Sequence, residues 1–137
     1  MVQARQLEPV YTKYDHFYFT FSGEIADKMR KTTRVRSIPN IFRFNPLSWI
    51  SGMILSAGIA LIERPDIVIS TGSGVTVFFC IFTKLLGAKL VFIESMAKVE
   101  KPTITARMLY PFTDLFIVQW SNLLEFFPKA IYVGRLF

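Results

Sequence analysis

From residue 66 onward, short apolar runs alternate with longer segments, and this alternation constrains the fold more than any other feature of the sequence. The apolar runs are rich in branched and aromatic side chains and occupy residues 66–70, 89–93, 114–118 and 130–133. The segments between them are predicted as helices over residues 75–86, 103–110 and 120–127. Parallel strands joined by crossover helices produce this pattern. The sequence therefore predicts an α/β fold with a Rossmann-like, doubly wound parallel sheet.

The first half of the chain is less regular. It predicts a short helix that ends near residue 13, strands over 16–21 and 35–38, and helices over 24–31 and 46–62. With 137 residues, the chain has the usual size of one domain. We therefore expect a single domain over residues 1–137.

The segment 44–62 contains no charged residue. Asn45 is placed to cap a helix, and Pro46 suits the first helical position. Small residues recur every fourth position on one face of this helix, which permits close approach to a neighbour; they are Ser48, Gly52, Ser56 and Ala60. Three interpretations stay open: a half-buried helix that touches a membrane, an internal core helix, and a membrane span of about 25 Å. Membrane contact is predicted for Arg43, Trp49, Ile50, Met53 and Ile54.

The composition favours an apolar or anionic neighbour. Hydrophobic residues make up 52% of the chain and charged residues 19%, so a partner subunit or a membrane is expected to cover apolar surface. The net charge is +6, and six basic residues lie between Lys28 and Arg43 without an acidic residue among them. Such a cluster favours phospholipid headgroups or a diphosphate, although a solvated basic face also fits. No nucleic-acid-binding module is recognisable, so nucleic acid is not expected as a partner.

Neither a metal nor a cofactor is predicted. The chain has one histidine, His16, and one cysteine, Cys80, which are too few for a zinc site. Cys80 lies within an apolar run and is predicted to be a small core side chain.

The loop at residues 71–74 is the first candidate site, because ligands of open parallel sheets bind beyond the carboxyl ends of the strands. It consists of Thr71, Gly72, Ser73 and Gly74. Its glycines permit a tight turn, and the free N–H groups of the following helix favour an anion such as a phosphate or diphosphate. The loop matches neither the GxGxxG fingerprint nor a P-loop, and a purely structural loop also fits.

Two further pairs of residues follow strands at the same edge of the sheet. Glu94 and Ser95 come after 89–93, where the carboxylate could orient a sugar hydroxyl, act as a general base, cap a helix or form a salt bridge. Gln119 and Trp120 come after 114–118 and combine an amide with a stacking surface of the kind that binds carbohydrate. A core tryptophan beside a capping glutamine fits this spacing equally well.

Several of these runs together resemble a known family. Residues 66–74, 88–98, 110–120 and 132–137 are similar to the PssD-like polysaccharide-biosynthesis proteins, and the similarity is strongest from 65 to 137. These are bacterial relatives of the eukaryotic membrane-anchor subunit of the dolichol-linked UDP-GlcNAc transferase. The resemblance implies the N-terminal half of a GT-B glycosyltransferase fold, which is the half that binds the acceptor.

The resemblance also implies a function. The chain would be the acceptor-binding subunit of a heteromeric glycosyltransferase, which adds a sugar from a UDP-sugar to a polyprenyl-diphosphate-linked saccharide. The product would belong to exopolysaccharide, capsule or lipid-linked oligosaccharide synthesis. The partner would be a PssE-like, UDP-sugar-binding catalytic subunit, and the chain would be peripheral to the cytoplasmic face of the plasma membrane.

Residue roles follow from the same resemblance. Glu94 is the expected catalytic residue, and Gly134, Leu136 and Phe137 are expected at the partner interface. The acceptor and its diphosphate would contact Thr71, Gly72, Ser73, Gly74, Ser95, Gln119 and Trp120.

One departure from the family concerns the N-terminal end. Members usually begin with a strand and a Gly-Gly-His loop, whereas this chain opens on a segment, 1–7, that resembles the helix after that loop. The expected sheet therefore lacks its first strand. Either the start is misplaced or truncated, or this copy has lost the strand. The alternative function is therefore a non-enzymatic membrane tether or inactive remnant that recruits a catalytic partner.

Overall fold

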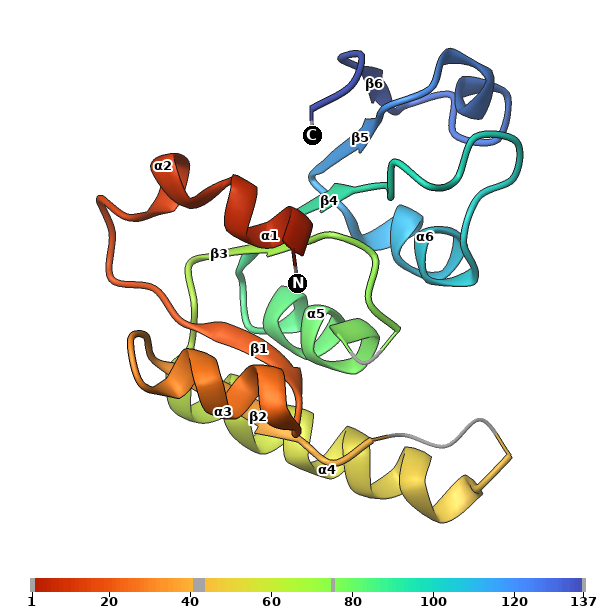
Figure 1. The fold of residues 1–137 in the computed structure, drawn as a ribbon. Coiled ribbons are helices and arrows are strands. Elements are labelled where there is room, and N and C mark those ends of the chain that lie inside the picture. The colour runs from red at the N-terminus through yellow and green to blue at the C-terminus, as the bar shows by residue number, and fades with distance from the viewer. Residues whose placement is uncertain (1, 41–43, 75, 137) are drawn as a thin grey trace.

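The computed structural model describes residues 2–40, 44–74 and 76–136 (Figure 1). The helices are α1 (Val2–Gln6), α2 (Glu8–Tyr11), α3 (Glu24–Arg30), α4 (Pro46–Glu63), α5 (Thr76–Leu85) and α6 (Ile104–Leu109), with the 3₁₀ turns η1 (Tyr110–Phe112) and η2 (Ser121–Glu125). The strands are β1 (Tyr18–Phe21), β2 (Val35–Ile38), β3 (Ile67–Ser70), β4 (Lys89–Ile93), β5 (Leu115–Val118) and β6 (Ile131–Tyr132).

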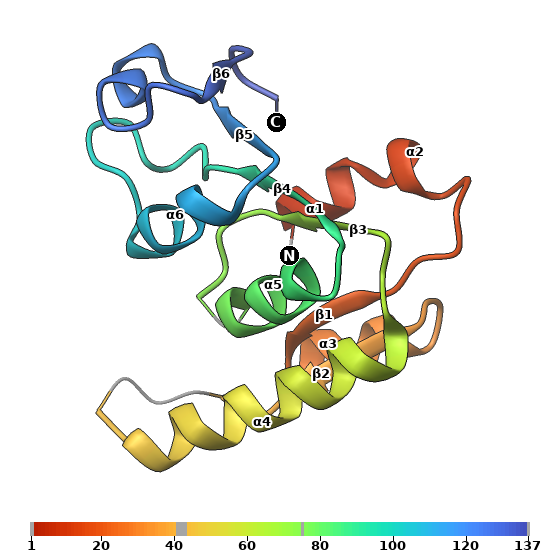
Figure 2. The same cartoon turned by 180° about the vertical axis from the view of Figure 1, so that it is seen from behind.

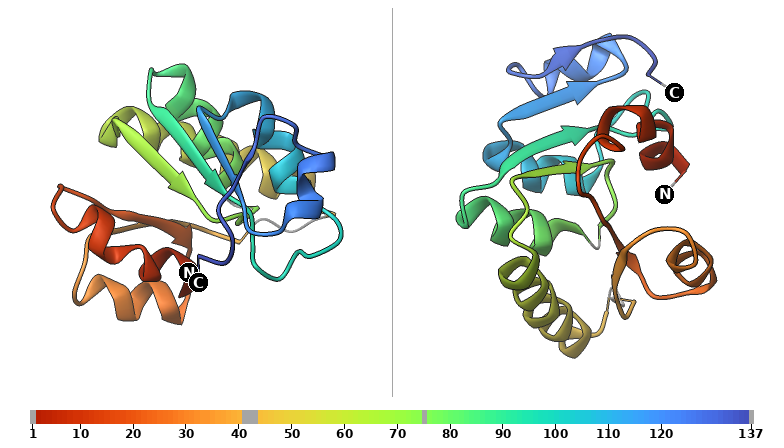
Figure 3. Two further views of the ribbon diagram at one scale, coloured as in Figure 1. Left: turned by 90° about the horizontal axis from the view of Figure 1, so that it is seen from above. Right: turned by 90° about the vertical axis from the view of Figure 1, so that its left-hand side faces the viewer.

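The strands form two parallel sheets. One has the order β3-β4-β5-β6 and the other pairs β1 with β2. Figure 3 shows α4 to α6 on one side of the strands and α1 to α3 on the other. The predicted α/β fold with helices on both faces of parallel strands is confirmed. The strands are divided, however, between β1 and β3, where the described residues form no pair.

The main core lies between the four-stranded sheet and the helices α5 and α6. Alternate residues of the strands face these helices and pack with residues of α5, α6 and the segment around η2. The buried members are Val77, Cys80, Leu90, Phe92, Ala106, Leu109, Phe116, Val118, Leu123 and Phe127. Gly87, with φ of 99°, follows α5 and turns the chain into β4, as expected of a glycine at a helix end.

A second, smaller cluster belongs to the N-terminal part. Tyr18 of β1 and Val35 of β2 pack on Ala26 and Met29 of α3. On the opposite side of β1, Phe19 stacks on Phe79 of α5, with ring centroids 4.3 Å apart. The two-stranded sheet is therefore covered on both sides as well.

Helix α4 runs along the edge of the molecule, beside α5 and β2 (Figures 1 and 2). Asn45 caps it by accepting a hydrogen bond from the Leu47 amide at 3.0 Å, as predicted. Gly52, Ser56 and Ala60 are its buried residues, which confirms that the stripe of small side chains allows close packing.

Some predicted elements are shorter in the structure. The helix expected over 120–127 is the 3₁₀ turn η2, because Trp120 is extended and Pro128 disfavours helical geometry at the residue before it. The strand expected over 130–133 is limited to the two residues of β6. The first predicted helix is divided into α1 and α2, and Pro9 lies in the first turn of the second.

Candidate functional site

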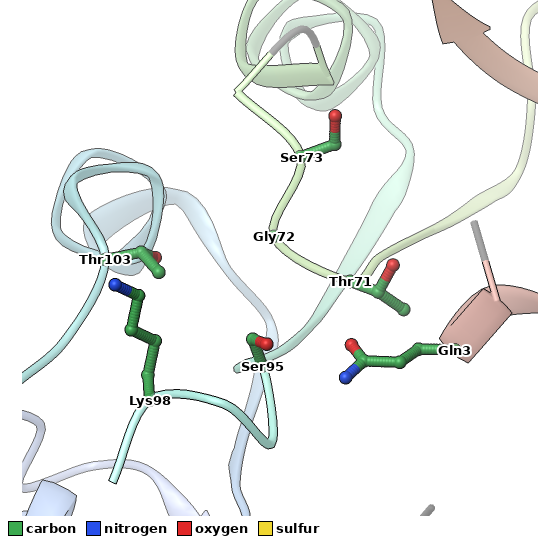
Figure 4. A pocket seen from close by; sticks show the side chains of 7 residues that line it. All are labelled: Gln3, Thr71, Gly72, Ser73, Ser95, Lys98 and Thr103. Atoms are coloured by element: carbon green, nitrogen blue, oxygen red, sulfur yellow. The ribbon is translucent and has the colours of Figure 1, made fainter. Parts of the chain in front are cut away.

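A pocket of about 470 Å³ lies beyond the carboxyl ends of β3 and β4 (Figure 4). Its walls come from the β3–α5 loop, the segment after β4 and helix α1. The lining residues are Gln3, Thr71, Gly72, Ser73, Ser95, Lys98 and Thr103. The pocket therefore contains four predicted site residues, Thr71, Gly72, Ser73 and Ser95, at the edge of the sheet where the sequence places them.

The β3–α5 loop is held in shape by hydroxyl groups. Ser70 and Thr76 are joined through their Oγ atoms at 3.1 Å, and the Thr76 hydroxyl donates to the Ser73 carbonyl at 2.7 Å. Gly72 has φ of 94°, which a side chain would strain. The loop leads into the ten-residue helix α5, whose N-terminal end carries partial positive charge near the pocket.

Glu94 lies behind the pocket wall and is completely buried. Its carboxylate accepts hydrogen bonds from the Ser95 amide at 2.9 Å, the Thr103 amide at 3.1 Å and the Thr103 hydroxyl at 3.2 Å. Among the described residues, no ion pair joins Glu94 to Lys98 or Lys101. The carboxylate thus fastens the segment 95–103 to the end of β4.

Thr103 connects the hydrogen bonds of Glu94 to helix α6. Its hydroxyl accepts a hydrogen bond from the Ala106 amide at 3.0 Å and so caps the helix. The same side chain also reaches Glu94 and the pocket.

Gln119 and Trp120 use their polar atoms within the fold. The buried Gln119 donates from Nε2 to the Glu94 carbonyl at 2.9 Å and accepts from the Leu136 amide at 3.0 Å. The Trp120 indole donates to the Met96 carbonyl at 2.9 Å. The structure does not bring these two residues, or Gly74, into the lining of the pocket. They hold the segment after β4 and the C-terminal segment together.

Sequence reasoning missed Gln3, Lys98 and Thr103 as pocket residues. Lys98 supplies the only cationic side chain of this lining, and its ammonium group extends toward Thr103 (Figure 4). Its place in the loop after β4, four residues beyond Glu94, was a usable signal. Gln3 had none, because it reaches the pocket only through the packing of α1.

The remaining polar candidates lie away from the pocket. His16 packs against the rings of Tyr11 and Tyr18, with centroids 5.0 and 5.9 Å from its own. Cys80 is a core residue, as predicted, and burial raises the pKa of its thiol to about 12. Within residues 2–40, 44–74 and 76–136, no three His, Cys, Asp or Glu side chains are grouped so that they could hold a metal ion.

The predicted membrane-contact residues lie on the exposed side of α4. Trp49, Ile50, Met53 and Ile54 are all exposed, while Arg43 lies outside the described residues. By length and composition alone, α4 is a helix that could cross a membrane. Of the predicted interface residues, Gly134 and Leu136 are described, and Phe137 lies outside the described residues.

Part of the basic cluster is used in ion pairs. Arg34 and Arg36 contact the carboxylate of Glu63, at 3.3 and 2.6 Å, and tie β2 to the end of α4. Arg30 pairs with Asp27 at 3.0 Å. Lys28 and Lys31 are exposed. The cluster is thus partly structural.

Comparison with known proteins gives consistent matches. The model of the family "Oligosaccharide biosynthesis protein Alg14 like" matches residues 4–136. Several relatives are named UDP-N-acetylglucosamine transferase subunit ALG14. That of Homo sapiens is 30% identical over 79% of this chain and 53% of the relative. That of Rattus norvegicus is 33% identical over 65% of this chain and 47% of the relative. That of Schizosaccharomyces pombe is 29% identical over 80% and 56%. The chain spans about half the length of these curated relatives, and it belongs to the Alg14-like family.

Proposed function

We propose that this chain is the acceptor-binding, membrane-associated subunit of a heteromeric UDP-sugar transferase, with UDP-N-acetylglucosamine as the donor. The acceptor is a polyprenyl-diphosphate-linked saccharide of lipid-linked oligosaccharide, exopolysaccharide or capsule synthesis. The observation that carries the proposal is the pocket, which is lined by a lysine, by several hydroxyl groups and by the loop that leads into α5. The names of the relatives support the donor and the subunit character.

The chemistry of the lining suits a diphosphate. The Lys98 ammonium is a point charge that can neutralise one phosphate, and the hydroxyls of Ser73 and Ser95 are neutral donors in the same lining. Thr71 adds a third hydroxyl. The positive end of the α5 dipole favours the same negative charge. The acceptor saccharide would then extend from the pocket toward the donor-binding partner.

The role of Glu94 is best assigned by its burial. The predicted catalytic role stays a prediction, but a fully buried carboxylate with hydrogen bonds to Ser95 and Thr103 supports a positioning role. If Glu94 is a general base, Glu94→Gln should lower kcat about 10²-fold or more and abolish the acidic limb of the pH profile. If Glu94 is a positioning residue, Glu94→Gln should raise KM for the acceptor and leave the pH profile unchanged. We expect the second result in the reconstituted enzyme.

The partner is a PssE-like subunit that binds the UDP-sugar, and the C-terminal segment is its docking surface in this proposal. Ile131, Tyr132, Val133 and Leu136 are exposed there, next to the Gln119 side chain that anchors the Leu136 amide. Leu136→Asp should weaken co-purification of the partner, whereas Leu85→Asp, at an equally apolar exposed position on α5, should not.

We propose peripheral contact with the cytoplasmic face of the plasma membrane through α4. Its exposed side combines Trp49, Ile50, Met53 and Ile54, while Lys28 and Lys31 supply cationic charge elsewhere on the exposed surface. Binding to vesicles with anionic lipid should fall at least about tenfold in Ile54→Glu, because a charge replaces apolar surface. Ile104→Glu, on the exposed part of α6, is the matched control and should leave vesicle binding unchanged.

The transferase assay tests the site directly. In the reconstituted pair, Lys98→Ala should raise KM for the diphosphate-linked acceptor about tenfold, while KM for the UDP-sugar stays the same. Lys101→Ala removes an exposed lysine from the same segment outside the pocket lining and should have no effect. Equal losses in both variants would show a general charge effect. A changed KM for the UDP-sugar would place the donor in this pocket and overturn the assignment.

A further inference from the structure

A buried glutamine joins the segment 133–136 to the wall of the pocket. The side chain of Gln119 is buried, and its Oε1 accepts a hydrogen bond from the Leu136 amide at 3.0 Å. Its Nε2 donates to the Glu94 carbonyl at 2.9 Å. The two polar atoms of one amide group are therefore bonded to two different segments of the chain.

Glu94 continues this series of hydrogen bonds into the pocket lining. Its carboxylate accepts from the Ser95 amide at 2.9 Å and from the Thr103 amide at 3.1 Å. Ser95 and Thr103 both line the pocket (Figure 4). Because Glu94 and Gln119 are both buried, a shift of either side chain is passed to the groups that it bonds. One continuous series thus leads from the Leu136 amide to the pocket.

The segment 133–136 is held to the rest of the fold by weak contacts. The Val133 amide has a 3.4 Å hydrogen bond to β5, and the Arg135 guanidinium lies 3.8 Å from the Met96 sulfur, both of which are long. The side chains of Val133 and Leu136 are 44% and 43% exposed. Among the described residues, the bond from Leu136 to Gln119 is the shortest polar contact of this segment. The segment can therefore detach without unfolding the core.

Detachment of the segment changes the state of Gln119. While the Leu136 amide is in place, both polar atoms of the buried side chain are bonded. After detachment Oε1 loses this partner, and a buried polar atom without a hydrogen bond costs about 1–3 kcal/mol. Rotation of the amide group toward water relieves this cost but weakens its bond to the Glu94 carbonyl. The segment thus has two arrangements, and only the attached one fixes the pocket wall.

We propose that Gln119 is a positioning residue that couples the attachment of segment 133–136 to acceptor binding. This inference rests on the proposed function of the pocket. The attached segment holds Ser95 and Thr103 in the arrangement that binds the diphosphate, and detachment lowers the affinity for the acceptor. A partner subunit docked on the attached segment strengthens acceptor binding. By linkage, the bound acceptor strengthens the attachment by the same factor.

The first test needs no variant. The chain in nanodiscs is compared with and without a saturating polyprenyl-diphosphate sugar. Amide exchange should slow at Ser95, within the pocket, and also about tenfold at Leu136, outside its lining. Slowing at Ser95 without slowing at Leu136 would overturn the coupling and leave the proposed function intact. No slowing at Ser95 would contradict the pocket assignment, and the coupling would fall with it.

A pair of variants tests the opposite direction. Leu136→Pro removes the amide hydrogen that Gln119 accepts, whereas Leu136→Ala removes the side chain and keeps this hydrogen. Leu136→Pro should raise the Kd for the same acceptor about tenfold, and Leu136→Ala should change it less than about twofold. This factor should match the factor by which the acceptor slows exchange at Leu136, because both report one coupling free energy. Equal Kd values in the two variants would overturn the proposal.

A double variant distinguishes coupling from general destabilisation. Gln119→Met removes both polar atoms at similar side-chain volume and should raise the acceptor Kd about as much as Leu136→Pro does. Both substitutions interrupt the same series of bonds, so the double variant should bind the acceptor no more weakly than Gln119→Met alone. Additive losses, about a hundredfold in the double variant, would contradict the coupling.

Discussion

The four-stranded region, residues 65–136, and the N-terminal region, residues 2–40, both contain parallel strands. They differ in how they are stabilised. The first buries a continuous cluster that includes Leu90, Phe92 and Phe116 beneath two helices. The second has the small cluster around Tyr18 and Met29, supplemented by ion pairs and ring contacts at its borders.

This difference explains where the pocket lies. Apart from Gln3, the pocket lining comes from the four-stranded region, in which packed strands hold the loops after β3 and β4. The N-terminal region is attached through Phe79 and through Glu63, which pairs with Arg34 and Arg36. We therefore expect substitutions in the first region to affect the whole chain and substitutions in the second to act locally.

The largest effect is expected from Phe92→Ala. Phe92 is completely buried and stacks on Phe116 with centroids 4.9 Å apart. Its truncation should lower the free energy of unfolding by about 3–5 kcal/mol. Urea unfolding followed by circular dichroism measures the loss. A loss below about 1.5 kcal/mol would mean that the four-stranded region does not dominate the stability.

A smaller and local effect is expected from Met29→Ala. The loss should be about 2 kcal/mol, the low end for such truncations, because the surrounding cluster is small and can collapse. Amide exchange should become faster in β1 and β2, while the amides of β4 and β5 keep their protection. Equal acceleration in both sheets would contradict the proposed division of the molecule into two regions.

Glu63→Gln tests the attachment of the N-terminal region to the end of α4. The Glu63 carboxylate is nearly buried and contacts two half-exposed arginines, so its neutralisation should cost about 1–2 kcal/mol. The matched control is Glu100→Gln at an exposed position, for which a change below about 0.5 kcal/mol is expected. Salt should reduce the difference between the two variants. If Glu63→Gln and Glu100→Gln had the same free energy of unfolding, the Glu63 ion pairs would make no measurable contribution to stability.

The smallest effect concerns Asp114, which borders the four-stranded region. The Lys84 ammonium and the Leu90 amide hold the pKa of its carboxyl below the ordinary value. The stabilisation is therefore present above the unfolded-state pKa of about 3.9 and is lost as the pH falls through the lower, folded-state value. Asp114→Asn should unfold at a lower urea concentration at pH 7, and the gap should close in acid. A gap that is constant down to pH 2 would contradict this.

The sequence predicted the four-stranded region better than the N-terminal region. Alternating runs and loop glycines identified β3, β4 and β5, because β4 and β5 each have an apolar, buried face and β3 contains a short run of branched apolar residues. The sequence did not predict that the strands form two separate sheets. The break between β1 and β3 depends on which strands pair, and the sequence pattern does not specify this. Helix α4 was predicted with its cap, because Asn45 and Pro46 act locally. The 3₁₀ turn η2 was missed, since the tether from Trp120 to Met96 is a tertiary contact.

For the site, the sequence located the edge of the sheet but not the direction of the side chains. Thr71, Ser73 and Ser95 line the pocket at this edge. Gln119 and Trp120 were chosen for hydrogen bonding and stacking, yet their polar atoms bond to the Glu94 and Met96 carbonyls. No local pattern distinguishes an inward from an outward amide after a strand.

The central claim is that this chain carries the acceptor side of a transferase. The most direct measurement is binding to the isolated chain in nanodiscs, with a polyprenyl-diphosphate sugar and UDP-N-acetylglucosamine compared as ligands. The pocket predicts that the acceptor binds and slows amide exchange at Thr71, Ser73 and Ser95, while the UDP-sugar does not bind. Binding of the UDP-sugar at these residues, with no binding of the acceptor, would contradict the account.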